Sequence, residues 1–375
     1  MKAIVSGGGT GGHIFPAVAI ANAIKKRRPD ADILFVGAEG RMEMEKVPAA
    51  GYPIKGLPIA GLQRQLTLQN IAKNLQLPFR ILKSRNMVHK ILKQFNPDIV
   101  VGVGGFASEP TLKEAASMGF PILIQEQNSY AGLTNKSLAR SADTICVAYD
   151  GMDRFFPKEK IVLTGNPVRE AIEQMTATRE EGLQHFGLSP DLPVVLVVGG
   201  SLGARSINQM MLNNLSFTTA NPMQVIWQTG RWGYDTATDA VEETEEYNRV
   251  KVHEFIQRMD LAYAAADVII SRAGAISISE LCLVGKPVIL IPSPNVAEDH
   301  QTKNAMALVE KGAAVMVRDA DCGSQGLQQA MNLLNDNARQ ETMSVAIKKL
   351  AAPKAAEHIV DEIEKLLAAK KHLNA

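Results

Sequence analysis

Gly7-Gly8-Gly9-Thr10-Gly11-Gly12-His13 separates two apolar stretches near the start of the 375-residue chain. Ala3-Ile4-Val5 precedes it, and the residues from Phe15 onward have helical spacing, so the local prediction is strand, glycine loop and helix. Glycine lets the backbone turn tightly and lets another group come close. The N–H groups and positive dipole at the start of a helix suit a phosphate or diphosphate. His13 ends this loop, where its side chain could face the anion or a reacting group.

The same stretch also fits the Gly-x-Gly-x-x-Gly fingerprint of dinucleotide-binding domains through Gly7, Gly9 and Gly12. Glu39, after the next strand, would then be the acid that binds a ribose. A run of five glycines in six positions is looser than this fingerprint requires. The rest of the chain must therefore decide between the interpretations.

Length and composition indicate a globular chain long enough for two domains, with 46% hydrophobic and 21% charged residues. The three cysteines, Cys146, Cys282 and Cys322, lack metal-ligand spacing, which favours buried thiols in a reducing cytosol. The N-terminus has no signal-peptide pattern, and no apolar run approaches the ~18 residues that span a bilayer. We therefore expect a protein that is soluble or rests on a membrane surface.

Charge is distributed unevenly along the chain. Residues 1–165 carry 21 Lys and Arg and 13 Asp and Glu, which gives a net charge of +8. Residues 166–375 carry 19 Lys and Arg and 26 Asp and Glu, which gives a net charge of −7. The basic half is expected to meet something anionic. Nucleic acid is the less favoured partner, because no basic patch with interleaved aromatic residues and no RNA-binding motif is present.

Continuous apolar runs indicate parallel strands that are buried on both faces. They lie at residues 3–5, 33–36, 99–103, 122–124 and 144–147, and again at 194–198, 224–227, 250–253, 268–270, 288–291 and 315–317. Helical spacing fills the intervals, and the second half opens like the first, with a strand, a glycine loop at 199–203 and a helix. The sequence thus predicts an α/β fold of two doubly wound, Rossmann-like domains, with the ligand in the cleft outside their strand ends. Residues 355–371 form an amphipathic helix that we expect to pack back across a domain.

Residues 62–93 contain seven Lys and Arg and no acidic residue, with leucine, isoleucine and phenylalanine interleaved. One interpretation is a core-facing helix with a solvated basic side. The other is a basic, apolar patch that rests on anionic lipid. Both remain open at this point.

Polar or glycine-rich clusters follow several of the predicted strands, where loops from parallel strands converge on one edge of a sheet. With further segments, they make the chain similar to the peptidoglycan N-acetylglucosaminyltransferases, GT-B enzymes that convert lipid I to lipid II. The segments that carry this resemblance span nearly the whole chain: Gly8-Gly9-Thr10-Gly11-Gly12-His13, Gly104-Gly105-Phe106-Ala107-Ser108, Glu126-Gln127-Asn128, Ala131-Gly132-Leu133-Thr134-Asn135, Gly165-Asn166-Pro167-Val168-Arg169, Gly199-Gly200-Ser201, residues 271–280 and Asp299-His300-Gln301-x-x-Asn304.

The resemblance implies that residues 166–352 bind the donor, UDP-N-acetylglucosamine. Ser201 would meet the diphosphate and Arg169 would help to neutralise it, while the backbone around Ile256 would receive uracil. Glu280 would accept from ribose hydroxyls and Gln301 would bind the sugar. The helix start formed by Ala275, Ile276, Ser277, Ile278 and Ser279 would lie under the phosphates, and Thr10, Gly11, Gly12 and Asn128 also match donor-contacting positions. Helix dipoles and Arg169 would stabilise the leaving UDP without a metal ion, so we expect no cofactor.

The resemblance also implies an acceptor, the undecaprenyl-diphosphate-linked muramyl pentapeptide, bound by residues 1–165, against which residues 353–375 pack. Its diphosphate suits the glycine loops, and its lipid stays in the bilayer beside residues 62–93, at the cytoplasmic face of the cell membrane. The muramyl 4-hydroxyl would displace UDP at the anomeric carbon with inversion, and cell-wall synthesis proteins are possible partners. His13 is the candidate base, because the pKa of histidine lies near working pH, and Glu126 is the reserve. At four positions, Phe106, Glu109, Leu202 and His300 replace residues common in the family.

Three alternatives stay in view. A sugar-nucleotide epimerase or a transferase acting on another lipid would share the two-domain shape. A nicotinamide-dependent oxidoreductase would explain the first glycine loop but not the second one with Glu280 downstream. A non-catalytic protein that binds lipid phosphates is the third.

Overall fold

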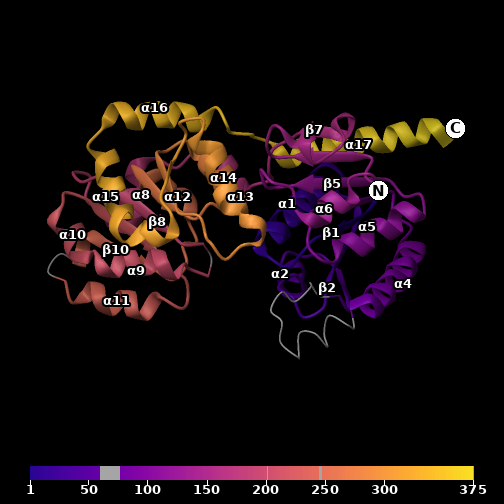
Figure 1. Ribbon diagram of the computed structural model, residues 1–375, viewed down its shortest axis with the longest axis horizontal. Helices are drawn as coiled ribbons and strands as arrows, with labels where there is room; N and C mark the ends of the chain where they lie inside the picture. Colours follow the sequence, from indigo (N-terminus) through magenta and orange to yellow (C-terminus); the bar gives the residue numbers. More distant parts are fainter. Residues whose placement is uncertain (60–76, 201, 245–246, 375) are drawn as a thin grey trace. The chain divides into compact units, whose positions relative to one another are not determined.

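The computed structural model describes residues 1–59, 77–200, 202–244 and 247–374. The chain divides into two compact units, residues 1–168 with 354–375, and residues 169–353. The sequence placed this boundary between residues 165 and 166. Each unit is a parallel sheet covered by helices, so the predicted α/β class with two Rossmann-like domains is confirmed (Figure 1).

The first unit has a seven-stranded parallel sheet in the order β3-β2-β1-β4-β5-β6-β7. Its strands are β1 (Lys2–Ser6), β2 (Asp32–Ala38), β3 (Ile54–Leu57), β4 (Ile99–Gly102), β5 (Ile122–Glu126), β6 (Thr144–Val147) and β7 (Ile161–Leu163). Its helices are α1 (Gly11–Arg27), α2 (Glu43–Ala49), α4 (Leu77–Phe95), α5 (Ser108–Ser117), α6 (Leu133–Leu138) and α17 (Ala355–Asn374). The order reverses at β1 and β4, so the loops that follow these two strands meet at one edge of the sheet.

The second unit has a six-stranded parallel sheet in the order β10-β9-β8-β11-β12-β13. Its strands are β8 (Val194–Val198), β9 (Gln224–Gln228), β10 (Val250–His253), β11 (Val268–Ser271), β12 (Val288–Leu290) and β13 (Val315–Met316). Its helices are α7 (Glu170–Glu173), α8 (Arg179–Phe186), α9 (Arg205–Asn213), α10 (Leu215–Ala220), α11 (Tyr234–Glu242), α12 (Met259–Ala265), α13 (Ala275–Val284), α14 (His300–Val309), α15 (Cys322–Leu334) and α16 (Asn337–Lys348). Here the order reverses at β8 and β11.

The last helix, α17, returns to the unit that contains the N-terminus (Figure 1). Its apolar face, with Ile359, Val360 and Ile363, is buried in the same core as residues of α1. At the edge of this contact, Arg27 pairs with Asp361 and Glu364. Burial of three large apolar side chains dominates the attachment, because exposed ion pairs contribute little.

Two strands of the structure were not predicted from the sequence, and both lie at the edges of the first sheet. β3 reads Ile-Lys-Gly-Leu and β7 has only three residues, none of them fully buried. Edge strands are covered less completely, so they lack the continuous apolar run that marked the central strands.

Candidate active site

The two loops at the reversal point of the first sheet touch through their backbones. A Cβ placed on Gly105 would lie 2.4 Å from the carbonyl oxygen of Gly8. Gly104 and Gly105 also have φ values of 94° and 91°, which side chains with a Cβ rarely adopt. Close approach and backbone conformation therefore both require glycine at position 105.

His13 lies against the second of these loops. A Cβ on Gly104 would be 3.0 Å from Nε2 of the His13 ring, while Nδ1 of the ring lies 3.1 Å from the carbonyl oxygen of Gly8. A carbonyl oxygen only accepts, so this contact assigns the ring proton to Nδ1 of the neutral imidazole. Nε2 then carries the lone pair, as a general base requires.

A buried carboxylate that the sequence analysis did not single out supports the first glycine loop. Glu43 of α2 is 1% exposed and accepts hydrogen bonds from the N–H groups of Gly9 at 2.9 Å and Ala38 at 3.0 Å. A Cβ on Gly8 would clash with this carboxylate, at 2.1 Å from Oε1. Glu39, the acid of the dinucleotide interpretation, is exposed and its Cγ lies over Gly56 instead. The N–H of Gly9 is thus directed at the protein's own carboxylate.

The start of α1 keeps the features of an anion site. Thr10 is the N-cap in an extended conformation and makes no side-chain cap, and the first turn holds no acidic residue. Thr10 and Gly12 are exposed, and Gly11 is partly exposed. The 17-residue α1 therefore presents a positive dipole end at this loop.

Glu126, at the end of β5, is fully engaged in holding the next loop. It is 1% exposed, and its two oxygens accept from the N–H and side-chain amide of Asn128, the N–H of Gly132 and the side-chain amide of Asn135, at 2.8–3.2 Å. Four donors occupy about as many acceptor positions as a carboxylate offers. This geometry makes Glu126 an organiser of the loop that carries Asn128, and it disfavours Glu126 as a base.

The segment Gly165-Asn166-Pro167 is tied to the same loop. Asn166 accepts from the amide of Gln125 at 2.9 Å and donates to the carbonyl oxygen of Gln127 at 2.9 Å. All three side chains are buried, at 0–2% exposure. Among the positions that depart from the family, Glu109 accepts from Lys113 at 2.7 Å, so its charge is compensated on the surface of α5.

In the second unit, the glycine loop after β8 interlocks with the loop after β9. A Cβ on Gly203 would lie 1.9 Å from the carbonyl oxygen of Thr229, and Gly203 has a φ of 80°. Ser201, the predicted diphosphate contact, lies outside the described residues. Gln228 joins this loop to the next one, because its amide donates to Gly200 at 3.0 Å and accepts from the N–H of Ile256 at 2.9 Å. The backbone N–H of Ile256, a predicted uracil contact, is therefore bonded within the protein.

Arg169 and Glu280, predicted to serve different parts of the donor, pair with each other. Nε and Nη2 of Arg169 donate to the two oxygens of Glu280, each at 2.6 Å, and the hydroxyl of Tyr263 donates to Oε2 at 3.3 Å. The Glu280 side chain is 5% exposed and that of Arg169 is 47% exposed. Burial raises the pKa of Tyr263 well above its usual value, so its hydroxyl stays a donor. The two-bond pair holds Glu280 in place, and the charge of Arg169 is compensated by the Glu280 carboxylate.

The predicted phosphate-binding helix start is formed by α13. Gly274 is its N-cap and has an extended backbone conformation. No side chain caps the N–H groups at the start of the helix, and no acidic residue lies in its first turn. Ile276 and Ser277 also lie in this turn. The N–H of Ile278 donates to the carbonyl oxygen of Gly274, and the hydroxyl of Ser279 donates to the carbonyl oxygen of Ala275. Arg272 braces the preceding loop, donating to Asp319 at 2.6 Å and to Ser206 at 2.8 Å. Gln301, the second residue of α14, accepts from the N–H of Ser293 at 2.8 Å.

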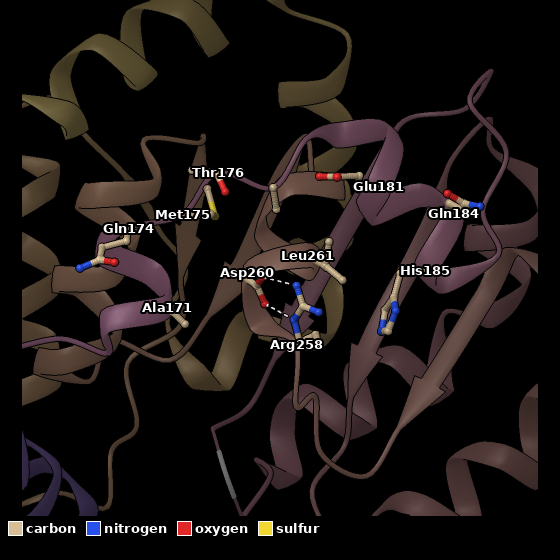
Figure 2. Close-up of a pocket in the computed structure, with 11 residues that line it drawn as sticks. Ala171, Gln174, Met175, Thr176, Glu181, Gln184, His185, Arg258, Asp260 and Leu261 are labelled. Atoms are coloured by element: carbon tan, nitrogen blue, oxygen red, sulfur yellow. Dashed lines mark hydrogen bonds and ion pairs between the residues drawn. The ribbon is translucent and has the colours of Figure 1, made fainter.

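A cavity of about 530 Å³ lies elsewhere in the second unit, and it contains none of the predicted site residues. Figure 2 shows the Arg258–Asp260 ion pair in its middle, with Gln174 on one side and His185 on the other. The pair compensates its own charge, and the remaining lining mixes donors with acceptors without a common direction. It therefore indicates no ligand class.

Among the described residues, no group of three or more His, Cys, Asp or Glu side chains could hold a metal ion. Cys146, Cys282 and Cys322 are buried free thiols, as predicted. Burial raises the pKa of Cys282 to about 12 and that of Cys322 to about 11, so both stay protonated near neutral pH.

Comparison with known proteins identifies the family whose two domains match this chain. Residues 3–147 match the glycosyltransferase family 28 N-terminal domain, and residues 194–359 match the C-terminal domain of the same family. The similar curated proteins include UDP-N-acetylglucosamine–N-acetylmuramyl-(pentapeptide) pyrophosphoryl-undecaprenol N-acetylglucosamine transferases. That of Parabacteroides distasonis is 56% identical over 98% of both chains, and that of Bacteroides thetaiotaomicron is 53% identical over 99% of both.

Solved structures agree with this match. The crystal structure of Acinetobacter baumannii MurG is 29% identical, with a TM-score of 0.79, and covers 97% of this chain and 99% of that chain. A UDP-GlcNAc 2-epimerase from Neisseria meningitidis, bound to UDP-GlcNAc, is 16% identical with a TM-score of 0.63 over 97% of this chain and 100% of that chain. The second likeness shows a shared fold alone.

Proposed function

The chain belongs to glycosyltransferase family 28, and we propose that it transfers N-acetylglucosamine from UDP-N-acetylglucosamine to undecaprenyl-diphosphate-linked muramyl pentapeptide. The reaction converts lipid I to lipid II in peptidoglycan synthesis. The observation that carries this proposal is the 56% identity to a curated transferase of this activity over 98% of the chain. Such identity over both units favours the same reaction over the epimerase and oxidoreductase alternatives.

The second unit is the donor-binding unit in this proposal. Glu280 is fixed by Arg169 and Tyr263. Among the described residues, its Oε1 accepts one hydrogen bond, from Arg169, so a second acceptor position suits a ribose hydroxyl. The start of α13, from Ala275 to Ser279, directs N–H groups and a positive dipole at the diphosphate. These groups stabilise the negative charge that develops on UDP as it leaves. Gln301 binds the sugar, and Ile256 marks the position of uracil.

The first unit binds the acceptor in this proposal, while Thr10, Gly11, Gly12 and Asn128 of its loops keep their predicted role as contacts of the donor. The muramyl 4-hydroxyl attacks the anomeric carbon of N-acetylglucosamine, the bond to the UDP oxygen breaks with its electron pair, and the configuration inverts. Nε2 of His13 takes the hydroxyl proton, which the assigned tautomer permits. Glu126 keeps the Asn128 loop in place, because four hydrogen bonds occupy its carboxylate.

The membrane contact lies on α4. The helix buries Val88 and Leu92, whereas Phe79 is 77% and Leu82 is 59% exposed near its start. Lys83, Lys90 and Lys93 are exposed on the same helix. The core-facing interpretation thus fits the second half of α4, and the lipid interpretation fits the first half. Residues 62–76 of the predicted patch lie outside the described residues. None of the described helices has the length and hydropathy needed to cross a bilayer. The exposed apolar and basic side chains of α4 support the proposal of peripheral binding at the cytoplasmic face.

Transfer is tested by incubating the protein with labelled UDP-N-acetylglucosamine and a lipid I analogue. We expect labelled lipid product that appears only when the acceptor is present. Labelled products formed without acceptor would indicate hydrolysis or epimerisation instead, and donor binding without turnover would indicate a binding protein.

Membrane binding is tested by flotation with vesicles that contain or lack acidic lipid. The full chain should float with acidic vesicles, and Phe79→Glu with Leu82→Glu should abolish this. Val345→Glu is the matched control, because Val345 is 50% exposed in the second unit. Equal flotation of the α4 variant and the control would contradict the assignment of α4.

A further inference from the structure

The segment that joins β12 to α14 contains two adjacent residues in the left-handed conformation. Glu298 has φ 53° and ψ 20°, and Asp299 has φ 54° and ψ 38°. Four non-glycine residues in the described chain have positive φ, and these two are the adjacent ones. A residue with a Cβ pays conformational free energy there, and such strain concentrates where ligands bind.

Other contacts hold this strained backbone in place. Nζ of Lys303 donates to the carbonyl oxygen of Glu298 at 2.8 Å, and the hydroxyl of Thr302 donates to the carboxylate of Asp299 at 2.7 Å. The helix that follows therefore fixes the two residues by their backbone and by Asp299. The side chain of Glu298 makes neither of these two contacts. The contacts therefore do not explain why a glutamate stands at position 298.

The carboxylate of Glu298 differs from the other acids at the predicted strand ends. Its Oε2 is closed off from solvent and has no hydrogen-bond partner among the described residues. Glu298 as a residue is partly exposed. Glu43, Glu126 and Glu280 are buried as whole residues, but each accepts two or more hydrogen bonds. A buried oxygen without a partner is unfavourable unless a ligand supplies the donor.

The neighbourhood indicates the kind of donor. Gln301, three residues further along, uses its Oε1 to accept from the N–H of Ser293, so its amide NH₂ is the group left to face a ligand. A carboxylate that accepts and an amide that donates together match sugar hydroxyls, which do both. Among the described residues, no Lys or Arg forms an ion pair with the Glu298 carboxylate, and Nζ of Lys303 donates to the backbone oxygen of Glu298 instead.

We infer that the Glu298 carboxylate accepts a hydrogen bond from a hydroxyl of the donor's N-acetylglucosaminyl group, beside Gln301. This inference rests on the proposed function, because it takes the donor to be UDP-N-acetylglucosamine. It adds a residue that recognises the sugar but not the nucleotide. The strained backbone is kept because it holds the carboxylate at that hydroxyl.

The test compares binding of UDP-N-acetylglucosamine with binding of UDP by titration calorimetry on the full chain. Glu298→Gln keeps the shape and removes the charge, so the affinity for UDP-N-acetylglucosamine should fall about ten- to a hundred-fold. The affinity for UDP should stay within two-fold of the parent. Glu310→Gln, at an exposed acid that follows the other end of α14, is the matched control and should change neither affinity.

Stability gives a second measurement. Since Glu298→Gln removes a charge that lacks a partner, the ligand-free melting temperature should not fall, while the rise caused by UDP-N-acetylglucosamine should shrink. Unchanged affinity for UDP-N-acetylglucosamine, or an equal loss for UDP, would overturn the inference. A parent protein that fails to bind UDP-N-acetylglucosamine would instead overturn the proposed function.

Discussion

Replacing Arg169 by glutamine tests whether the Arg169–Glu280 pair is structural as well as functional. The two hydrogen bonds of the pair measure 2.6 Å each, and the Glu280 side chain is only 5% exposed. Arg169→Gln would leave this buried carboxylate with only the neutral hydroxyl of Tyr263 as its remaining partner among the hydrogen bonds described above. A buried charge that loses its partner destabilises the folded state.

The size of the effect follows from burial. Breaking a fully buried pair costs about 3–5 kcal/mol, whereas an exposed pair contributes about 0–1 kcal/mol. Arg169 is 47% exposed, so water can enter on its side and solvate part of the carboxylate. We therefore expect Arg169→Gln to lower the free energy of unfolding by about 2–3 kcal/mol. Adding Glu280→Gln removes the charge, so the double variant should recover to within about 1 kcal/mol of the parent.

Urea denaturation followed by tryptophan fluorescence is the assay, because both tryptophans, Trp227 and Trp232, lie in the second unit. Arg258→Gln is the matched control. Arg258 also donates two bonds to an acid, Asp260, but its side chain is 57% exposed and the loss should be clearly smaller. An Arg169→Gln variant that unfolds at the same urea concentration as the control would refute the reasoning, as would a double variant no more stable than the single one.

Three further outcomes are expected. His13→Gln should lower kcat by about 10²–10⁴-fold and flatten the acid limb of the pH–rate profile while UDP affinity is unchanged; retained turnover would exclude His13 as the base. Gly105→Ala should destabilise the first unit by at least about 2 kcal/mol in thermal unfolding, because its Cβ would meet the carbonyl oxygen of Gly8 at 2.4 Å. Burial alone would raise the pKa of Glu114, but bonds from His89 and Arg85 outweigh it and lower the pKa. This stabilisation is present above the unfolded-state pKa and is lost as pH falls through the folded-state pKa, so melting of Glu114→Gln should depend less on pH in the acid range.

The central strands could be predicted because their chemistry is local. A run such as residues 194–198 is apolar at every position, and the structure buries all five residues of β8. Edge strands β3 and β7 have no such run, since one side faces solvent or a polar neighbour. The glycine loops were predicted for the same local reason, because Gly104 and Gly105 follow a buried strand.

The partners of the polar side chains could not be predicted. Arg169 and Glu280 are 111 residues apart, and Glu43 is 34 residues from Gly9, so sequence spacing carries no information about either bond. The sequence suggested Glu39 as the acid near the first loop, and the fold supplies Glu43 because α2 turns it inward. Gln228 ends a strand whose residues are all buried, which was the one available sign that its amide must find partners within the protein.

These unforeseen contacts have a common consequence for how the loops could act on a substrate. Gly9 donates to Glu43, Ile256 donates to Gln228, and Gly132 donates to Glu126, so a side chain from another element fixes each loop before any ligand arrives. A loop with all its N–H groups unpaired would have to be ordered by the substrate, and that ordering would weaken binding. Fixing part of each loop internally leaves fewer N–H groups for the phosphates but holds them in position. The same reasoning separates Glu298 from the supporting acids, because its buried carboxylate oxygen fixes no loop.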